Sequence, residues 1–224
     1  MLLKIKNINK SYNELHSEKS VIFKNLDFSF EEENIIPIYG PSGIGKTTLL
    51  NIIGTVDSPD SGEIYLNDIK YCPKTYQALR KKHIGYMFQF HYLLPEFTIF
   101  ENLDLTLRIK GEKDNSKIKN MITEILSDFK ILNKMNRYPS QISGGEKQKV
   151  SLARSVINNP SLVIADEPTG NLDFDNANLI IDKIKSISKD RGVKFLIATH
   201  NKEFQRISDS IYNISNLKLV KKII

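Results

Sequence analysis

The sequence predicts an α/β domain with a mainly parallel core sheet, an N-terminal antiparallel flap of strands and a helical insertion. Short, nearly continuous apolar runs at residues 35–39, 161–166 and 195–199 are typical of strands buried on both faces of a sheet. The first 30 residues instead alternate apolar with polar side chains, which indicates half-buried strands. From residue 98 to about residue 132 the apolar spacing becomes helical, so the chain mixes both kinds of element.

Composition sets the broad class of the protein. The chain has 224 residues, enough for a sizeable core, and we expect one domain over residues 1–224 with the helical part inserted at about 90–160. With 40% hydrophobic and 26% charged residues, a disordered chain is excluded. The single cysteine, Cys72, excludes an internal disulfide and fits a reducing compartment.

Neither a membrane span nor a signal peptide is predicted. Residues 3–6 alternate apolar side chains with lysine, as a strand does, and no apolar run approaches the roughly 18 residues that a span needs. The net charge of +6 is compatible with an anionic partner. Because no block of five or six like charges stands out, we do not expect that partner to be nucleic acid.

Residues 40–48 form a glycine-rich loop that predicts a phosphate site. The segment matches the pattern G-x-x-x-x-G-K-[ST] and lies between an apolar strand and an apolar helix-like run. Glycines let backbone N–H groups turn toward phosphate oxygens at the positive end of the following helix. Lys46 would reach the β- and γ-phosphates, and the Thr47 hydroxyl would hold Mg²⁺. The loop residues are Gly40, Pro41, Ser42, Gly43, Ile44, Gly45, Lys46, Thr47 and Thr48.

The strands before the loop, at residues 2–8 and 21–30, would form the antiparallel flap. Tyr12 lies between them. Its ring would either stack on an adenine base or pack into the core, and the residue pattern alone favours neither.

A second group of strands follows the loop helix. Residues 63–66 form a short strand closed by a turn at Asn67 and Asp68, and the next strand covers residues 83–88. Gln89 lies at the end of that strand. Its amide oxygen would contact a metal or water, or the side chain would simply lie on the surface.

Residues 98–132 form the helical insertion. Apolar side chains recur at helical spacing on both sides of a polar break at residues 111–116. Apolar residues of this insertion that remain exposed would receive a protein partner.

The next helix begins at residues 143–146, which are Ser143, Gly144, Gly145 and Glu146. Serine followed three residues later by glutamate is a capping box, which alone would explain a well-started helix. Two glycines are more than a cap needs. They leave N–H groups bare at a helix N-terminus, which predicts a second anion site.

A buried strand over residues 161–166 ends in two acids. Asp166 would hold Mg²⁺ as the companion of the phosphate loop, and Glu167 would act as general base on the attacking water. Pro168 is expected to keep Glu167 in an extended conformation at the tip of the strand.

The last predicted helix starts at residues 171–173 and has an apolar face formed by Leu179, Ile180, Ile184 and Ile187. The buried strand at 195–199 follows. His200 lies at its carboxyl end, where ligands bind in parallel sheets, so we expect it beside Glu167 and Gln89.

These residues occur in a recognisable order: the 40–48 loop, Gln89, the segment 143–146, Asp166 with Glu167, Asp173 and His200. This order resembles the ATP-binding cassette of ABC transporters, and the resemblance covers nearly the whole chain. The departures are mild: Ile142 stands where leucine is usual, and Lys147 and Lys149 stand where arginine is common. None of them removes a phosphate contact.

The resemblance implies a role for each residue. Tyr12 would stack on adenine, Gln89 would sense the γ-phosphate and Mg²⁺, and His200 would contact the γ-phosphate. Cassettes of this family dimerise head to tail, so residues 143–146 would close on ATP held by the other copy. The implied catalytic residues are Glu167 and His200, the metal ligands are Thr47, Gln89 and Asp166, and the nucleotide contacts are Tyr12, residues 40–48, Gln89, Ser143, Gly144, Gly145, Glu146 and Asp173.

Residues 170–173 resemble a subgroup of these cassettes that serves lipoprotein release, macrolide efflux and cell division. Within that subgroup, residues 88–98 are most similar to lipoprotein-releasing cassettes. This implies an ATPase on the cytoplasmic face of the inner membrane, bound to a separate transmembrane subunit. Efflux of a macrolide or antimicrobial peptide, or a cell-division role, is the alternative. A nucleic-acid-associated ATPase of the family is more distant, because it needs a long coiled coil where residues 90–142 stand here without sustained heptads.

Overall fold

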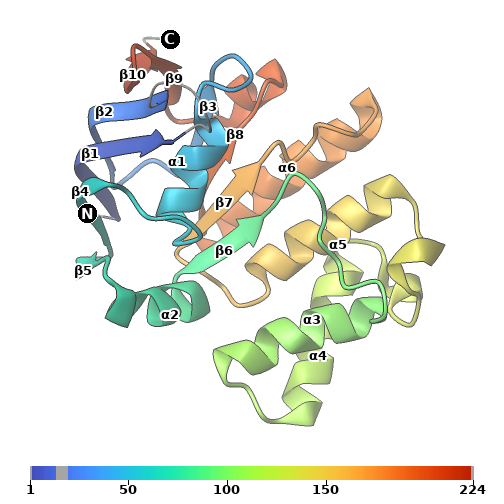
Figure 1. Ribbon diagram of the computed structural model, residues 1–224. Coiled ribbons are helices and arrows are strands. Elements are labelled where there is room, and N and C mark those ends of the chain that lie inside the picture. The colour runs from blue at the N-terminus through green and yellow to red at the C-terminus, as the bar shows by residue number, and fades with distance from the viewer. Residues whose placement is uncertain (1, 14–19, 223–224) are drawn as a thin grey trace.

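The computed structural model describes residues 2–13 and 20–222. Figure 1 shows a central sheet with helices on both sides and a second, smaller sheet beside helix α1. The strands are β1 (Leu3–Tyr12), β2 (Ser20–Phe30), β3 (Ile35–Tyr39), β4 (Ser61–Leu66), β5 (Ile69–Lys70), β6 (Ile84–Met87), β7 (Leu162–Asp166), β8 (Lys194–Ala198), β9 (Ile211–Ser215) and β10 (Lys218–Lys222). The α-helices are α1 (Lys46–Ile53), α2 (Pro73–Lys82), α3 (Ile99–Lys110), α4 (Asn115–Asp128), α5 (Gly144–Val156) and α6 (Phe174–Arg191).

The central sheet has six strands in the order β10-β9-β3-β8-β7-β6. All neighbours are parallel except β10, which pairs antiparallel with β9. The sheet is therefore mainly parallel, as the continuous apolar runs predicted. Parallel strands end at the same edge, so the residues that follow β3, β7 and β8 are brought together there.

Alternation along each strand sends side chains to two separate cores. In β7, Leu162 and Ile164 face one cluster, while Val163 and Ala165 face the other. The first cluster packs α1 and the small sheet against the central sheet. The second cluster is formed with α3, α4, α5 and α6 on the opposite face. The central sheet is thus covered on both faces, which is why its strands lack polar alternation.

The small sheet is the predicted flap. Its order is β2-β1-β4-β5, and every neighbouring pair is antiparallel. Asn67 and Asp68 both have positive φ, 49° and 61°, and form the tight turn between β4 and β5. The flap prediction is confirmed.

Helices α3 and α4 occupy the helical insertion, with Gly111 in the left-handed conformation at the end of α3 and Asp114 capping α4. The insertion boundaries of about 90–160 stay a prediction. No helix in the described ranges is long and apolar enough to span a membrane.

One expected face was wrong in part. Ile180, Ile184 and Ile187 of α6 are buried, whereas Leu179 is 55% exposed. At 100° per residue, the three isoleucines fall within about 60° of one another, and Leu179 lies about 80° outside the stripe that they define.

Helix α2 and strands β9 and β10 were not predicted. Only Leu79 of α2 is buried, so apolar periodicity gives almost no signal there. The local signals were Pro73 at the first helical position and a basic last turn at residues 80–82.

Gly85 on β6 provides a test of the packing between the sheet and α5. A Cβ at this position would lie 2.0 Å from the carbonyl oxygen of Ser155, which is backbone and cannot rotate away. Gly85→Ala should therefore lower the free energy of unfolding by about 2–3 kcal/mol, measured by urea denaturation. Gly192→Ala is the control, because its Cβ meets open space and only its φ of 66° opposes the change; we expect about 1 kcal/mol. Equal losses in the two variants would contradict this packing account.

Candidate functional site

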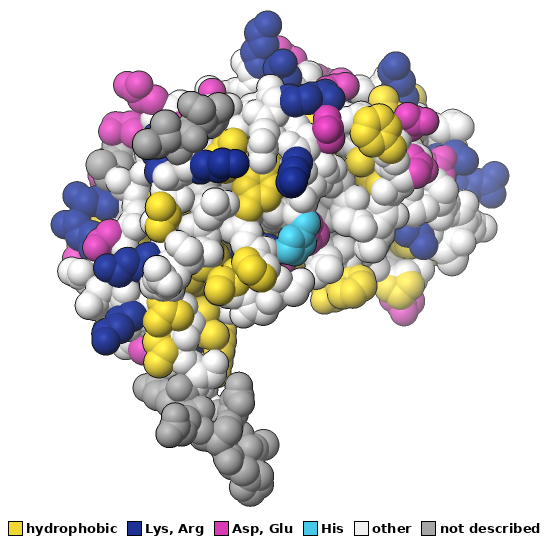
Figure 2. All heavy atoms as spheres, turned by 90° about the horizontal axis from the view of Figure 1, so that it is seen from above, with side chains coloured by type: hydrophobic (Ala, Val, Ile, Leu, Met, Phe, Trp, Pro, Cys, Tyr) yellow, Lys and Arg dark blue, Asp and Glu magenta, His cyan; other side chains and the backbone are white. Residues whose placement is uncertain are grey.

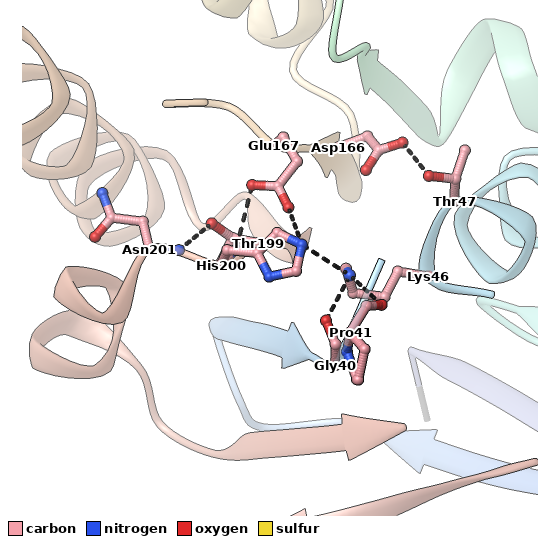
Figure 3. A network of polar contacts seen from close by, with 9 residues as sticks. All are labelled: Gly40, Pro41, Lys46, Thr47, Asp166, Glu167, Thr199, His200 and Asn201. Atoms are coloured by element: carbon pink, nitrogen blue, oxygen red, sulfur yellow. Dashed lines mark hydrogen bonds and ion pairs between the residues drawn. The ribbon is translucent and has the colours of Figure 1, made fainter. Parts of the chain in front are cut away.

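A cavity of about 510 Å³ opens at the carboxyl edge of the central sheet. The loop between β3 and α1 forms one wall, and the residues that follow β7 and β8 form the other. Figure 3 shows Lys46 pointing across this space toward His200 and Glu167. The cavity is lined by Ser42, Gly43, Gly45, Lys46, Thr47, Thr48, Gln89, Asp166, Glu167, Gly170 and His200.

Gly45 allows the loop to turn into α1. Its φ is 107°, and a Cβ would lie 2.5 Å from Cγ2 of Ile22 and 3.1 Å from the Phe23 ring. A side chain is thus excluded both by conformation and by space. Gly45 caps α1 without a side-chain hydrogen bond, so within the described chain no side-chain cap blocks the first N–H groups of the helix. Such a helix start can bind an anion.

Lys46 is the central cation of the cavity. Its Nζ donates to the carbonyl oxygens of Gly40, at 2.7 Å, and Pro41, at 3.1 Å, and lies 3.2 Å from Nε2 of His200. Burial lowers the pKa of Lys46, and the charges of Glu167 and Asp166 oppose that decrease. The ammonium group is thus bonded to two carbonyls of its own loop.

Thr47 and Asp166 form a hydrogen-bonded pair across 119 residues of chain. The Thr47 hydroxyl donates to Oδ2 of Asp166 at 2.7 Å. Burial raises the pKa of Asp166, while the Thr47 hydroxyl and the Lys46 charge act in the opposite direction. Two oxygen ligands thus stand together beside the phosphate loop, which is the donor chemistry that Mg²⁺ prefers.

The backbone of Glu167 differs from the prediction. We expected an extended conformation before Pro168, but φ is 44°, in the left-handed region. The reason is tertiary: the Glu167 N–H donates to Ala198 on β8 at 2.8 Å, while its carbonyl accepts from Gly170 at 3.0 Å to close a tight turn. These two bonds override the local preference. Strain of this kind costs on the order of 1–3 kcal/mol and occurs most often at functional sites.

The Glu167 carboxylate points into the cavity beside His200. Oε2 accepts from the His200 backbone N–H at 3.2 Å, and Oε1 lies 3.4 Å from His200 Nε2. Oε1 is buried and makes no hydrogen bond to any described residue. An acceptor left in this state is available for a water or ligand proton.

Gln89 and His200 were both expected near Glu167, and both line the cavity with it. The side chain of His200 is 52% exposed, so it lies at the mouth of the cavity. Gln89 is exposed just after β6, and together with Thr47 and Asp166 it also lines a second cavity.

Tyr12 does not enter the core. Its ring is exposed, its hydroxyl donates to Asp57 at 2.6 Å, and Lys10 Nζ lies 4.7 Å from the ring centre. Burial is the largest cause that raises the pKa of Tyr12, and the Thr48 side chain acts on it in the opposite direction. The tyrosine is therefore close to the end of the phosphate loop. Lys10 and Asp57, which hold it, were not predicted, because neither belongs to a motif.

The segment 143–146 lies apart from this cavity. The Ser143 hydroxyl accepts from the Glu146 N–H at 3.3 Å, and the Glu146 carboxylate accepts from the Ser143 N–H at 2.8 Å, so the capping box is formed. A Cβ on Gly144 would meet no described atom within 4 Å. The start of α5 is thus an open helix N-terminus that lines no part of the 510 Å³ cavity.

Asp173 is also outside the cavity. It caps α6, with its carboxylate accepting from the backbone and the side-chain amide of Asn176, both at 2.8 Å. A Cβ on Gly145 would lie 3.3 Å from Oδ1 of the same Asn176. The segments that contain Gly145 and Asp173 are therefore neighbours.

The donor set fits MgATP better than a metal ion alone. In the described part of the chain, no cluster of three or more His, Cys, Asp or Glu side chains could hold a metal. Thr47, Asp166 and Gln89 supply only one carboxylate, so a bound Mg²⁺ would need phosphate oxygens and water to complete its shell. The free N–H groups of α1 and the Lys46 cation match those phosphates.

Comparison with known proteins identifies relatives that bind adenine nucleotides. A family model described as "ABC transporter" matches residues 23–170. The lipoprotein-releasing system ATP-binding protein LolD of Treponema denticola is 43% identical over 201 residues, covering 88% of each chain. Its counterpart from Wigglesworthia glossinidia brevipalpis is 37% identical and covers 99% of this chain and 97% of its own length.

Solved structures agree with the fold. The ATP-binding cassette MJ0796, in a dimeric post-hydrolysis state bound to ADP and Pi, superposes with a TM-score of 0.90 at 31% identity. It covers 99% of this chain and 98% of its own. A second dimeric structure of MJ0796 also gives a TM-score of 0.90, at 32% identity.

Asp166→Asn should stabilise the nucleotide-free protein. A carboxyl whose pKa is higher in the folded than in the unfolded state loses stability as it ionises, so its cost is present at high pH and absent below its unfolded pKa of about 3.9. We expect the variant to gain about 0.5–2 kcal/mol in free energy of unfolding at pH 7–8, and to lose that gain near pH 4. Urea unfolding at several pH values measures this. Asp182→Asn, at an exposed acid, is the control; a less stable Asp166→Asn protein at pH 7–8 would refute the expectation.

Proposed function

This chain belongs to the ABC transporter family, and we propose that it is the ATP-hydrolysing subunit of a system that releases lipoproteins from the inner membrane. The hydrolysis part rests on the cavity that joins Lys46, the Thr47–Asp166 pair, Glu167 and His200. The lipoprotein part rests on similarity to lipoprotein-releasing system ATP-binding proteins over 88–99% of this chain. A separate transmembrane subunit would carry the cargo, with this chain peripheral on the cytoplasmic face.

Phosphate binding would begin by exchanging partners at Lys46. Its two carbonyl contacts and its contact with His200 Nε2 hold the ammonium group at the cavity wall. A γ-phosphate carries far more negative charge than a carbonyl oxygen, so Lys46 would turn to it. Bound Mg²⁺ would neutralise phosphate charge, with Thr47, Asp166 and Gln89 as its protein ligands.

Glu167 is the proposed general base. Its Oε1 is buried beside the His200 imidazole and can accept a proton from a water that enters the cavity. His200 would hold the γ-phosphate from the other side, because it already contacts both Lys46 and Glu167. Phosphoryl transfer needs positioning and charge stabilisation more than covalent chemistry, and these side chains supply both.

A second copy of the chain would complete the site. The N-terminus of α5 has the chemistry to bind phosphate but does not line the cavity of its own chain. In a head-to-tail dimer it would close on the nucleotide held by the partner. Both MJ0796 structures are dimeric, which supports dimerisation of this chain.

The loop after Gln89 is the proposed contact with the membrane subunit. Phe90 and Tyr92 are 62% and 63% exposed, with Leu94 and Phe97 nearby in the chain. Exposed aromatic residues in one loop are typical of a protein interface.

The distribution of charge argues against a nucleic-acid partner. On the face shown in Figure 2, Lys and Arg side chains are interspersed with Asp and Glu and form no continuous basic stripe.

Glu167→Gln should trap an ATP-bound dimer. Loss of the base should lower the hydrolysis rate by about 100-fold or more, while the phosphate contacts remain. Light scattering with MgATP should then give the mass of two chains, and the mass of one chain without nucleotide. Lys46→Ala is the control that should neither bind ATP tightly nor dimerise. Wild-type hydrolysis by Glu167→Gln would refute the assignment of the base.

Co-purification tests the cargo. Tagged Glu167→Gln protein, expressed in its native cells and solubilised with ATP, should bring down a membrane protein together with a lipoprotein. An efflux pump or a cell-division membrane protein in its place would keep the ATPase and overturn lipoprotein release. Nucleic acid without a membrane protein would overturn the transport function.

A further inference from the structure

Gln148 is a polar side chain buried in α5, two residues after the capping glutamate. It is only 4% exposed. Ser151, Leu152 and Ser155, at three, four and seven residues further on, are also buried, so Gln148 belongs to the face of α5 that packs against the rest of the domain. A buried amide needs hydrogen-bond partners, since leaving it unpaired costs on the order of 1–3 kcal/mol.

The partner of this amide is the backbone beside Glu167. Nε2 of Gln148 donates to the carbonyl oxygen of Pro168. Because Pro168 directly follows Glu167, the bond ties α5 to the turn that carries the proposed general base. None of the motifs in the sequence pointed to this contact.

The turn at Glu167 needs stabilising contacts from other elements. Glu167 has a φ of 44°, which a residue with a Cβ adopts only when surrounding contacts impose it. Its N–H is bound to Ala198 on β8 and its carbonyl to Gly170 within the turn. The bond from Gln148 reaches the next carbonyl from a different element, so the turn is held from two sides.

The other side of Gln148 faces the loop that follows Gln89. The His91 imidazole lies against the Gln148 side chain and the backbone of Gly144. Burial lowers the pKa of His91, followed by the charges of Lys147 and Arg154, and the two contacts just named oppose the decrease. Arg154, also on α5, donates to the carbonyl oxygens of His91 at 2.6 Å and Tyr92 at 2.7 Å. Helix α5 thus makes hydrogen bonds to this loop through Arg154 and to the turn at Glu167 through Gln148.

We propose that Gln148 is a positioning residue for hydrolysis, which holds the Glu167 carboxylate in place through the Pro168 carbonyl. This rests on the proposed role of Glu167 as general base. Gln148 does not reach the nucleotide cavity, and it acts on the rate only through Glu167. The start of α5 is the surface proposed to meet the partner's nucleotide, so the same helix connects that surface to the base of its own chain.

Gln148→Met tests the proposal, because methionine keeps the length and removes the donor. We expect kcat for ATP hydrolysis to fall about 10-fold or more, since small displacements of a catalytic group have large effects. The KM for ATP and the ATP affinity should stay within about twofold, because residues 40–48 are untouched. Ser155→Ala is the matched control: its hydroxyl is buried on the same helix, and among the described residues it bonds only to the Leu152 carbonyl within α5. It should leave kcat unchanged.

A double-mutant cycle separates positioning from a general loss of structure. If Gln148 acts through Glu167, then Gln148→Met should not slow the residual hydrolysis of Glu167→Gln any further. A further 10-fold loss in the double variant would overturn the proposal, as would wild-type kcat in Gln148→Met. Gln148→Asn, whose amide is one methylene shorter, is read in the same way if the methionine variant does not fold.

The same measurements distinguish the inference from its premise. If Glu167→Gln is inactive and Gln148→Met is as active as wild type, only the positioning role fails. If Glu167→Gln hydrolyses ATP at the wild-type rate, the general base itself is wrong.

Discussion

The chemistry of the site depends on Lys46, a cation that lines the cavity proposed to bind phosphate. Its pKa is lowered by burial, and its only partners among the described residues are two carbonyls of its own loop and one imidazole. None of these neutralises the charge. Asp166 and Glu167 lie near enough to favour the charged form, but they bond to Thr47 and to His200. A bound phosphate would give Lys46 the anionic partner that the two carbonyls and the imidazole do not supply.

The parallel sheet makes this assembly possible. Residues near positions 46, 166 and 200 are far apart in sequence, and they meet because β3, β7 and β8 end at one edge. The two cores hold the sheet from both faces, so the strand ends have little freedom. Rigid elements position the reactive groups, and loops carry them.

Much of this was predictable because its signals are local. The phosphate loop, the capping box at Ser143 and the acids after β7 each follow from a short pattern with a known physical cause. The parallel core and antiparallel flap followed from apolar periodicity. The sequence also placed Gln89 and His200 at strand ends, and both line the cavity.

The features that were missed depend on contacts between distant segments. The positive φ of Glu167 is imposed by a bond to β8, against the extended preference that Pro168 creates. The tie from Gln148 to Pro168 joins residues on two elements that no motif connects. Helix α2 has a single buried residue, so its pattern is too weak to recognise. Tertiary context decides these features, and one sequence does not display it.

The most direct test of the account is an experimental structure of Glu167→Gln with MgATP. The account predicts two copies, with each triphosphate between residues 40–48 of one chain and residues 143–146 of the other. Lys46 should leave the carbonyls of Gly40 and Pro41 for phosphate oxygens, and the Thr47–Asp166 pair should open around Mg²⁺. Triphosphates contacted by one chain only, with Lys46 still bound to its own loop, would contradict the composite site.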